Sequence, residues 1–198
     1  LYGDMLFDIT NADNPEDFAE KIDHYTYLLY KMSHLFICLS RKYIESPQNN
    51  FGDVLTFNPG DEMKMIISKN SVSREPASEG YFSSNELLPI FSQERGFPVA
   101  YYISPLHYNN NFFGYCAVSY GKEPLSFSSL YLKWINYVNV ALEQVRIKAM
   151  MNKTIFDTNR VLLYDEYTGL LNRNGLVREV AVSASVPVDC IRIQLTGL

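Results

Sequence analysis

Apolar side chains recur at alternating spacings of four and three residues through the first quarter of the chain, as on one face of a helix. The repeat follows Asn14, which can cap free amides, Pro15, which suits a first turn, and two acidic residues that face the positive end of the helix dipole. It stops before Pro47. We therefore expect one long helix, packed on the domain's own sheet or on the same helix of a second subunit. The stripe consists of Phe18, Ile22, Tyr25, Leu29, Met32, Phe36, Leu39 and Tyr43.

Between residues 51 and 121 the pattern changes to short runs of apolar and β-branched side chains separated by turn residues, which indicates strands. The loop at 107–111 contains three asparagines, which tolerate left-handed turn geometry, so we expect a β-hairpin there. One long helix, several antiparallel strands and a closing helix predict an α+β fold. The expected elements are strands at 53–57 and 63–68 around a turn at 58–61, a short helix at 85–93, and hairpin strands at 97–106 and 112–120.

A seven-residue apolar repeat begins near Ser129, and no proline or glycine interrupts it before Gly169. At the usual helical rise it can form one rod of roughly 50 Å. Two alternatives are open: a helix that covers the sheet and leads into a linker, or a rod that pairs with its twin in a homodimer. We favour the rod, because the repeat is longer than one small sheet can cover. The predicted dimer and signalling positions are Ile135, Val138, Leu142, Val145, Ala149, Asn152 and Phe156.

Composition narrows the class of protein. With 47% apolar and 14% aromatic residues, a chain of 198 residues can build a packed core. The net charge of −5 without a basic cluster argues against a nucleic-acid partner and fits a cytoplasmic protein. No apolar stretch reaches the roughly 20 residues that cross a bilayer, so we expect no membrane segment within this chain. The spacing of Cys38, Cys116 and Cys190 predicts reduced thiols rather than a disulfide frame or a metal site.

The most specific motif of the chain follows the second helix. Residues 164–175 read Tyr-Asp-Glu-Tyr-Thr-Gly-Leu-Leu-Asn-Arg-Asn-Gly. This run resembles the opening of a GGDEF (diguanylate cyclase) domain, whose pattern is Asp-x-Leu-Thr-Gly-Leu-x-Asn-Arg, although Tyr167 replaces the first leucine. The positions that fit the pattern are Asp165, Thr168, Gly169, Leu170, Asn172 and Arg173.

The resemblance implies a domain that condenses two GTP molecules to cyclic di-GMP with the help of Mg²⁺. Its opening residues are structural, and Asp165 is expected to pair with Arg173, while Asn172 suits a helix cap. Because only 23 residues follow Gly175, we expect a piece of a longer protein, without catalysis or a cofactor of its own. Gln194 stands where the family has its first metal-binding aspartate, and it is a poorer ligand for a hard cation. The sequence therefore leaves the activity of the intact protein open.

A second resemblance covers residues 15–149. A strand that ends in Pro105-Leu106, a returning strand around Gly114, and Leu125-Ser126-Phe127-Ser128 before the last helix resemble the second half of a GAF domain. Gly114 is expected to mark a close approach or a bulge. A PAS-like fold is the alternative. GAF domains often hold a small ligand between sheet and helices, but the sequence identifies none here. Four tyrosines could line such a pocket or belong to the core: Tyr101, Tyr102, Tyr115 and Tyr120.

These patterns predict four segments: the tail of a preceding segment (1–14), a GAF-like sensor domain (15–149), a signalling-helix linker (150–164) and the start of a GGDEF domain (165–198). We expect a cytosolic sensing and dimerisation module that regulates a C-terminal GGDEF-type domain in cyclic di-GMP signalling. Two alternatives stay open. The chain could belong to an active diguanylate cyclase, or it could be a ligandless interaction scaffold with a degenerate GGDEF domain.

Overall fold

The computed structural model of the chain describes residues 2–29, 32–47, 53–70, 80–92, 99–121 and 129–182. Contacts between Cα atoms divide the chain into two compact units. We call Leu1–Met151 the sheet unit and Asn152–Leu198 the motif unit. Within the described ranges, no helix combines the length and the apolar character that crossing a bilayer requires.

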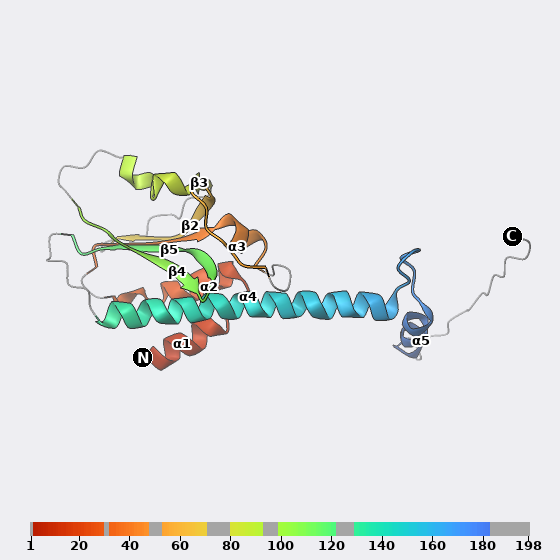
Figure 1. The fold of residues 1–198 in the computed structure, drawn as a ribbon. Helices are drawn as coiled ribbons and strands as arrows, with labels where there is room; N and C mark the ends of the chain where they lie inside the picture. The colour runs from red at the N-terminus through yellow and green to blue at the C-terminus, as the bar shows by residue number, and fades with distance from the viewer. Residues whose placement is uncertain are drawn as a thin grey trace, which may run out of the picture. The chain divides into compact units, whose positions relative to one another are not determined.

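The sheet unit is an α+β domain built on a five-stranded antiparallel sheet with the strand order β3-β2-β1-β5-β4 (Figure 1). The central strand β1 pairs with β2 on one side and with β5 on the other. Strands β4 and β5 form a hairpin at one end of the sheet, and the short β3 lies at the other. The strands are β1 (His34–Ser40), β2 (Glu62–Asn70), β3 (Tyr81–Ser83), β4 (Tyr102–Tyr108) and β5 (Asn111–Ser119).

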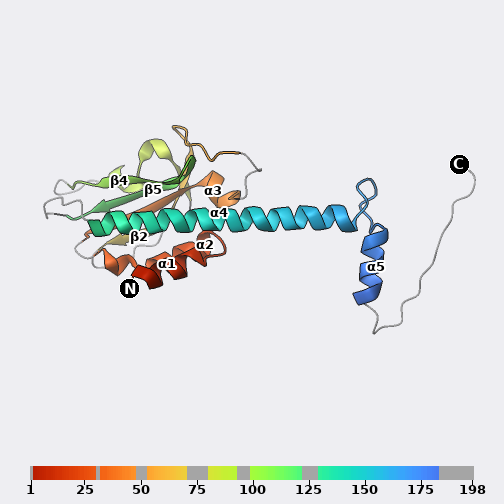
Figure 2. The ribbon, with the colours of Figure 1, turned by 60° about the horizontal axis from the view of Figure 1, so that its bottom comes forward.

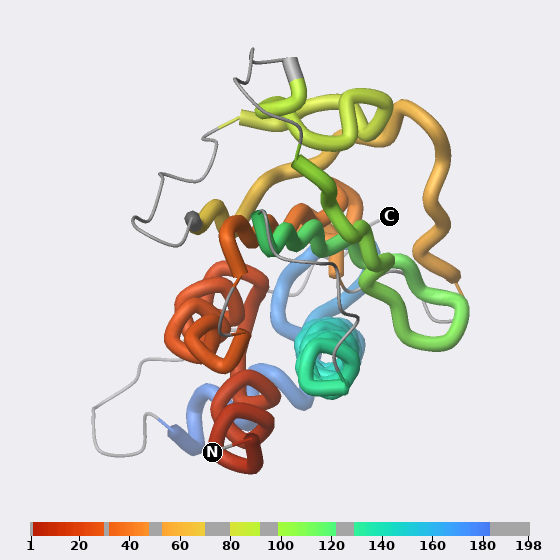
Figure 3. The backbone as a smooth tube through the Cα atoms, turned by 90° about the vertical axis from the view of Figure 1, so that its left-hand side faces the viewer, coloured from red at the N-terminus to blue at the C-terminus, as the bar shows by residue number. Residues whose placement is uncertain are grey.

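Helices cover one face of this sheet. Figures 1, 2 and 3 show α1 (Tyr2–Thr10), α2 (Pro15–Asp23) and the first half of α4 (Ser129–Leu163) on the same side. Between them and the sheet lies the larger apolar core, which we call the large cluster. It consists of Met5, Ile9, Ala12, Phe18, Ile22, Leu28, Leu29, Leu35, Ile37, Leu39, Tyr43, Leu55, Ile67, Leu106, Phe113, Cys116, Val118, Tyr131, Trp134, Ile135, Val138, Ala141, Leu142 and Val145.

The opposite face of the sheet carries a second core under the short 3-10 helices η2 (Ser84–Glu86) and η3 (Pro89–Ser92) (Figure 3). We call it the small cluster. It consists of Phe36, Cys38, Met63, Met65, Phe82, Leu88, Tyr115 and Ala117. Burying both faces is what allows the central strands to be apolar at nearly every position.

The single long helix predicted from residue 15 toward Pro47 is wrong. Helix α2 begins as expected, because the Asn14 side chain accepts a hydrogen bond from the Asp17 amide at 2.8 Å, but it ends at Asp23. The stripe continues through the 3-10 turn η1 (Thr26–Leu28), strand β1 and the short helix α3 (Arg41–Glu45). Because β1 is buried on both faces, its run Leu-Phe-Ile-Cys-Leu does not alternate and is indistinguishable from one face of a helix.

The sheet unit also starts earlier than predicted. Residues 1–14 were expected to be the tail of a preceding segment, yet they contain α1. Met5 and Ile9, one helical turn apart, are fully buried in the large cluster, and Ala12 joins them. The N-terminal segment therefore contributes side chains to the large cluster and belongs to the sheet unit.

The strand predictions are confirmed in part. The segment at 53–57 belongs to no strand; instead Leu55 is hydrogen-bonded to residues Asn111 and Phe112 beside the hairpin. The predicted strand at 63–68 is β2, but a bulge opposite Ile37 and Cys38 turns Ile67 into the large cluster, away from Met63 and Met65. Register shifts of this kind leave no mark in the alternation of side chains.

The predicted β-hairpin is confirmed as β4 and β5, with a tighter turn than expected. Only Asn109 and Asn110 form the turn, and Asn109 has a φ of 50°. Gly114 makes the predicted close approach, since a Cβ there would lie 2.0 Å from the Cys38 carbonyl oxygen. The helix expected at 85–93 is replaced by η2 and η3, as far as residue 92; residues 93 and 97–98 lie outside the described residues.

Candidate functional site

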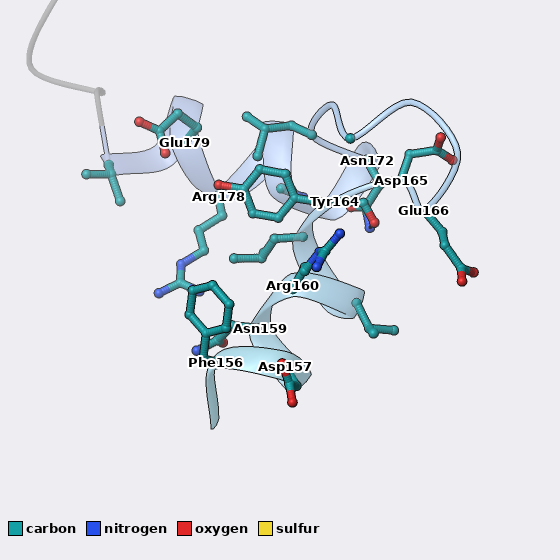
Figure 4. A pocket seen from close by; sticks show the side chains of 16 residues that line it. Phe156, Asp157, Asn159, Arg160, Tyr164, Asp165, Glu166, Asn172, Arg178 and Glu179 are labelled. Atoms are coloured by element: carbon teal, nitrogen blue, oxygen red, sulfur yellow. Dashed lines mark hydrogen bonds between the residues drawn. The ribbon is translucent and has the colours of Figure 1, made fainter. Parts of the chain in front are cut away.

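The motif that resembles a GGDEF opening forms a compact junction between α4 and α5 (Arg173–Val182) in the motif unit (Figure 4). Tyr164 and Leu171 form an antiparallel bridge. The Asp165 amide donates to the Leu170 carbonyl at 2.7 Å, and the Asn172 amide donates to the carbonyl of Leu163, the last residue of α4, at 2.9 Å. The chain thus leaves α4, closes a loop and returns to the end of the same helix before it starts α5.

Asp165 and Thr168 close the loop. One carboxylate oxygen of Asp165 accepts from both the amide of Thr168 at 2.9 Å and its hydroxyl at 2.8 Å. These hydrogen bonds favour the ionised form and lower the pKa of Asp165 below its ordinary value. Gly169 donates its amide to the Asp165 carbonyl at 2.9 Å with a φ of 68°, a left-handed geometry that glycine adopts without strain. The Asp, Thr and Gly of the motif are therefore the residue types that this turn requires.

Asn172 caps two helices at once, which confirms it as a helix cap. Its side-chain nitrogen Nδ2 donates to the carbonyl oxygens of Leu162 at 3.0 Å and Tyr164 at 3.3 Å. Its side-chain oxygen accepts from the Gly175 amide in the first turn of α5 at 3.0 Å. Helix ends leave carbonyls and amides without partners inside the helix, and this side chain satisfies both kinds. One residue thereby fastens the end of α4 to the start of α5.

Gly175 is a junction residue that the sequence pattern did not single out. It is buried, and a Cβ there would lie 2.1 Å from the Leu163 carbonyl oxygen and 2.9 Å from a methyl carbon of Leu171. Only a glycine allows α5 to approach α4 this closely. A glycine near the start of a predicted helix carries a cost in helix propensity, and that cost was the available signal.

The expected ion pair between Asp165 and Arg173 is not among those formed by the described residues. Asp165 accepts from Thr168 instead, and Arg173 lies exposed at the start of α5. Leu170, the remaining motif residue, is also exposed. The cause is local, because the Asp165 carboxylate accepts hydrogen bonds inside its own turn.

A groove of about 1230 Å³ lies between the last turns of α4, the loop and α5. Figure 4 shows Phe156, Tyr164 and Arg178 along it. Its wall combines apolar side chains with charges of both signs, among them Arg160 and Glu179. In the described part of the chain, no three His, Cys, Asp or Glu side chains gather as a metal site would require. The groove is thus an open surface of mixed apolar and charged character beside the junction.

The predicted dimer positions separate into two groups along α4. Four of them lie in the large cluster with at most 6% exposure, so their own sheet unit buries them: Ile135, Val138, Leu142 and Val145. Ala149 is half-buried, Asn152 is exposed, and Phe156 is 68% exposed. The covering alternative thus describes most of the first half of α4, although Leu130 and Leu132 are exposed there, and the second half exposes a longer set of apolar side chains. These are Met151, Ile155, Phe156, Val161 and Leu162.

The four tyrosines do not line one common pocket. Tyr115 belongs to the small cluster and Tyr101 packs against it, whereas Tyr102 and Tyr120 pack against the large cluster on the other face. They are core and rim residues of two separate layers. His107, expected in the hairpin loop, lies in β4, and its backbone amide donates to the Asn139 side chain at 3.1 Å.

No protein-family model, no curated protein and no solved structure matches this chain. The two family resemblances therefore remain predictions, and the geometry of the junction and of the sheet unit is what can support them.

Proposed function

We propose that this chain is a signal-sensing and dimerisation module, with a GAF-like sensor domain, that regulates a GGDEF-type domain in cyclic di-GMP signalling in the cytoplasm. In this proposal the sheet unit receives the signal and α4 carries it. The junction passes the signal to a domain of which residues 165–198 are the start. The chain itself performs no catalysis.

The observation that carries the proposal is the double cap at Asn172. Its side chain hydrogen-bonds the carbonyls of Leu162 and Tyr164 at the end of α4 and the Gly175 amide in the first turn of α5, all within 3.3 Å. With Gly175 against Leu163, the two helices cannot move separately without breaking these contacts. A sensor that shifts or rotates α4 would move α5 with it, which is what a signal relay requires.

The first half of α4 is suited to respond to the sheet unit. Trp134, Val138 and Leu142 are fully buried in the large cluster. The Tyr43 hydroxyl on α3 donates to the Leu142 carbonyl at 2.8 Å, and Lys148 donates to the Ala12 carbonyl at 3.0 Å. Because packed interiors deform in discrete steps, a rearrangement of this core would displace the helix as a body.

Dimerisation supplies the second half of the proposed mechanism, since condensation of two GTP molecules needs two GGDEF-type domains face to face. The proposed contact is the part of α4 beyond residue 150, where the exposed Phe156 continues the predicted seven-residue repeat. Asn152 and Asn159 lie on the same repeat, and buried asparagines in a paired helix fix its register. A ligand would act only if it binds two arrangements of this pair with different affinity.

The test uses the natural protein that carries the whole GGDEF-type domain, assayed with GTP and Mg²⁺ for cyclic di-GMP. We expect Asn172→Ala to uncouple the output from the sensor, so that cyclic di-GMP synthesis no longer changes with the signal. The matched control is Asn174→Ala, an exposed asparagine two residues on, which should behave as wild type. Equal regulation in both variants would remove the junction from the relay.

A GGDEF-type domain without cyclase activity is also compatible with regulation by the sheet unit. Gln194 lies outside the described residues, and a neutral amide there would weaken Mg²⁺ binding. If the whole protein makes no cyclic di-GMP, but nucleotide still shifts its melting temperature, the domain is a regulatory relic. Absence of any thermal shift across a nucleotide and metabolite panel would instead favour the scaffold alternative.

A further inference from the structure

One segment of the sheet unit covers the small cluster. Residues 84–92, which contain η2 and η3, lie over the sheet face opposite to α1 and α2 (Figure 1). We call them the covering segment. Leu88 is 1% exposed within the cluster, and Ile90 packs against it. The covering segment thus shields the small cluster from solvent.

The middle of the covering segment is strained. Leu87 has a φ of 57° and a ψ of −60°, and the Leu88 amide donates to the Glu86 carbonyl at 2.6 Å. This is a γ-turn with positive φ at its centre, an arrangement that is rare and costly for a residue with a side chain. The Leu87 side chain is 43% exposed, so its own packing does not account for the strain. Contacts made elsewhere must hold the turn.

The contact at this point comes from the sheet. The Tyr115 hydroxyl donates a hydrogen bond to the Leu87 carbonyl. Tyr115 is nearly buried in β5, where pairing with the central strand fixes its backbone. The start of the covering segment has a separate anchor, since the Ser84 amide donates to the Asp61 carbonyl and the Ser84 hydroxyl accepts from the Gly60 amide, both at 2.9 Å. The segment therefore has an anchored start and a strained turn in its middle, and the Tyr115 hydroxyl hydrogen-bonds directly to that turn.

We propose that Tyr115 and the Leu87 turn form a strained latch, whose release lets the covering segment leave the sheet and uncover the small cluster while the large cluster stays packed. The Leu87 turn relaxes when its hydrogen bond to Tyr115 breaks, so opening of the covering segment releases the strain energy that the closed state stores. The device gives this face of the sheet a covered and an open state, and it does not depend on the proposed function.

Two buried cysteines report which face opens. Cys38 lies in the small cluster beneath the covering segment, whereas Cys116 lies in the large cluster on the helical face. Burial raises the pKa of both thiols, that of Cys116 to about 12, so neither reacts while it is covered. Release of the latch should expose Cys38 alone. Cys116 serves as an internal control for global unfolding.

The experiment measures the rate at which N-ethylmaleimide alkylates each cysteine of the folded chain, followed by peptide mass spectrometry. We expect Tyr115→Phe to accelerate alkylation of Cys38 on the order of tenfold, as loss of one buried hydrogen bond allows, with no change at Cys116. The Tyr115 hydroxyl also opposes the rise in the pKa of the Cys38 thiol. Its removal would by itself raise that pKa and slow alkylation, so faster alkylation reports opening of the covering segment.

A second pair of variants tests the strain and leaves the core intact. Leu87→Gly and Leu87→Ala both remove the exposed side chain, but only glycine adopts the positive φ without cost. We expect Cys38 to react more slowly in Leu87→Gly than in Leu87→Ala, on the order of tenfold for a strain of this class.

Two results would overturn the latch. Equal Cys38 rates in the two Leu87 variants would mean that the turn stores no strain that opening releases. Parallel acceleration of Cys38 and Cys116 in Tyr115→Phe would mean that the domain opens as a whole. If Tyr115→Phe proves unstable, the Leu87 pair decides by itself, because an exposed turn residue can change without loss of the core.

Discussion

Gly175 lies against the carbonyl oxygen of Leu163, so close that a Cβ on Gly175 would stand 2.1 Å from that oxygen. The first turn of α5 is thereby placed on the last residue of α4. Asn172 caps both helix ends at the same point, and Asp165 closes the loop between them. The junction is determined by contacts among these few residues, and most of its consequences can be tested by single substitutions.

Gly175→Ala should break this contact. The added methyl group meets a backbone oxygen that cannot rotate away, so we expect a loss of about 1–3 kcal/mol in the stability of the junction, as for overpacked sites. Hydrogen exchange at the amides of Asn172 and Leu176 measures it. Gly3→Ala is the control, since nothing lies within 4 Å of a Cβ there, and it should stabilise α1 slightly. Similar effects in both variants would contradict the close approach.

Thr168→Val should shift the titration of Asp165. The hydrogen bonds from the Thr168 side chain and backbone lower the pKa of Asp165 in the folded chain below the ordinary value of 3.8. The loop is therefore fully stabilised above that ordinary value, and the contribution is lost as pH falls through the lowered pKa. NMR titration of the carboxyl carbon should show the pKa rising in Thr168→Val. In Tyr167→Phe, a change at an exposed neighbour, it should stay where it is.

Arg146→Met should destabilise the sheet unit. Arg146 makes two hydrogen bonds with Glu143 at 2.7 and 2.8 Å, and Glu143 is 7% exposed. Without its partner the carboxylate stays buried and unpaired, which costs about 3 kcal/mol in comparable sites. Denaturant unfolding measures the loss.

The control for this ion pair is Arg41→Met. Arg41 pairs with Glu45 and Glu62 at the surface, with 44% of its side chain exposed. Because water screens exposed pairs, we expect a loss of at most about 1 kcal/mol. If the two substitutions cost the same, burial does not set the importance of the Glu143–Arg146 pair.

Phe156→Glu should weaken the proposed dimer without unfolding the chain. The Phe156 side chain is 68% exposed, so its replacement should change stability by no more than about 0.5 kcal/mol. A charge in a paired seam should shift the sedimentation coefficient toward that of a monomer. Asn174→Glu adds the same charge at an exposed position of α5, outside the α4 contact, and should leave self-association unchanged. A wild-type chain that is monomeric at high concentration would refute the contact.

Local rules were sufficient where the chemistry is local. The Asn14 cap, the turn of the β4–β5 hairpin and the cap that Asn172 makes on Gly175 each depend on residues within about four positions of one another. They could therefore be predicted from the printed sequence. The turn of residues 165–169 is equally local, since hydrogen bonds join its Asp, Thr and Gly, but the sequence predicted a pair between Asp165 and Arg173 in its place.

Long-range packing decided the rest. Residues 34–40 have a helical stripe, yet they form the central strand, because pairing with β2 and β5 and burial on both faces outweigh local preference. The division of α4 into a buried first half and an exposed second half depends on where the sheet ends, which periodicity does not record. The strained Leu87 turn and the close approach of Gly175 likewise exist only because distant segments meet. The sequence pattern shows which side chains are apolar and gain free energy when they are buried. Only the tertiary structure determines which segments bury them.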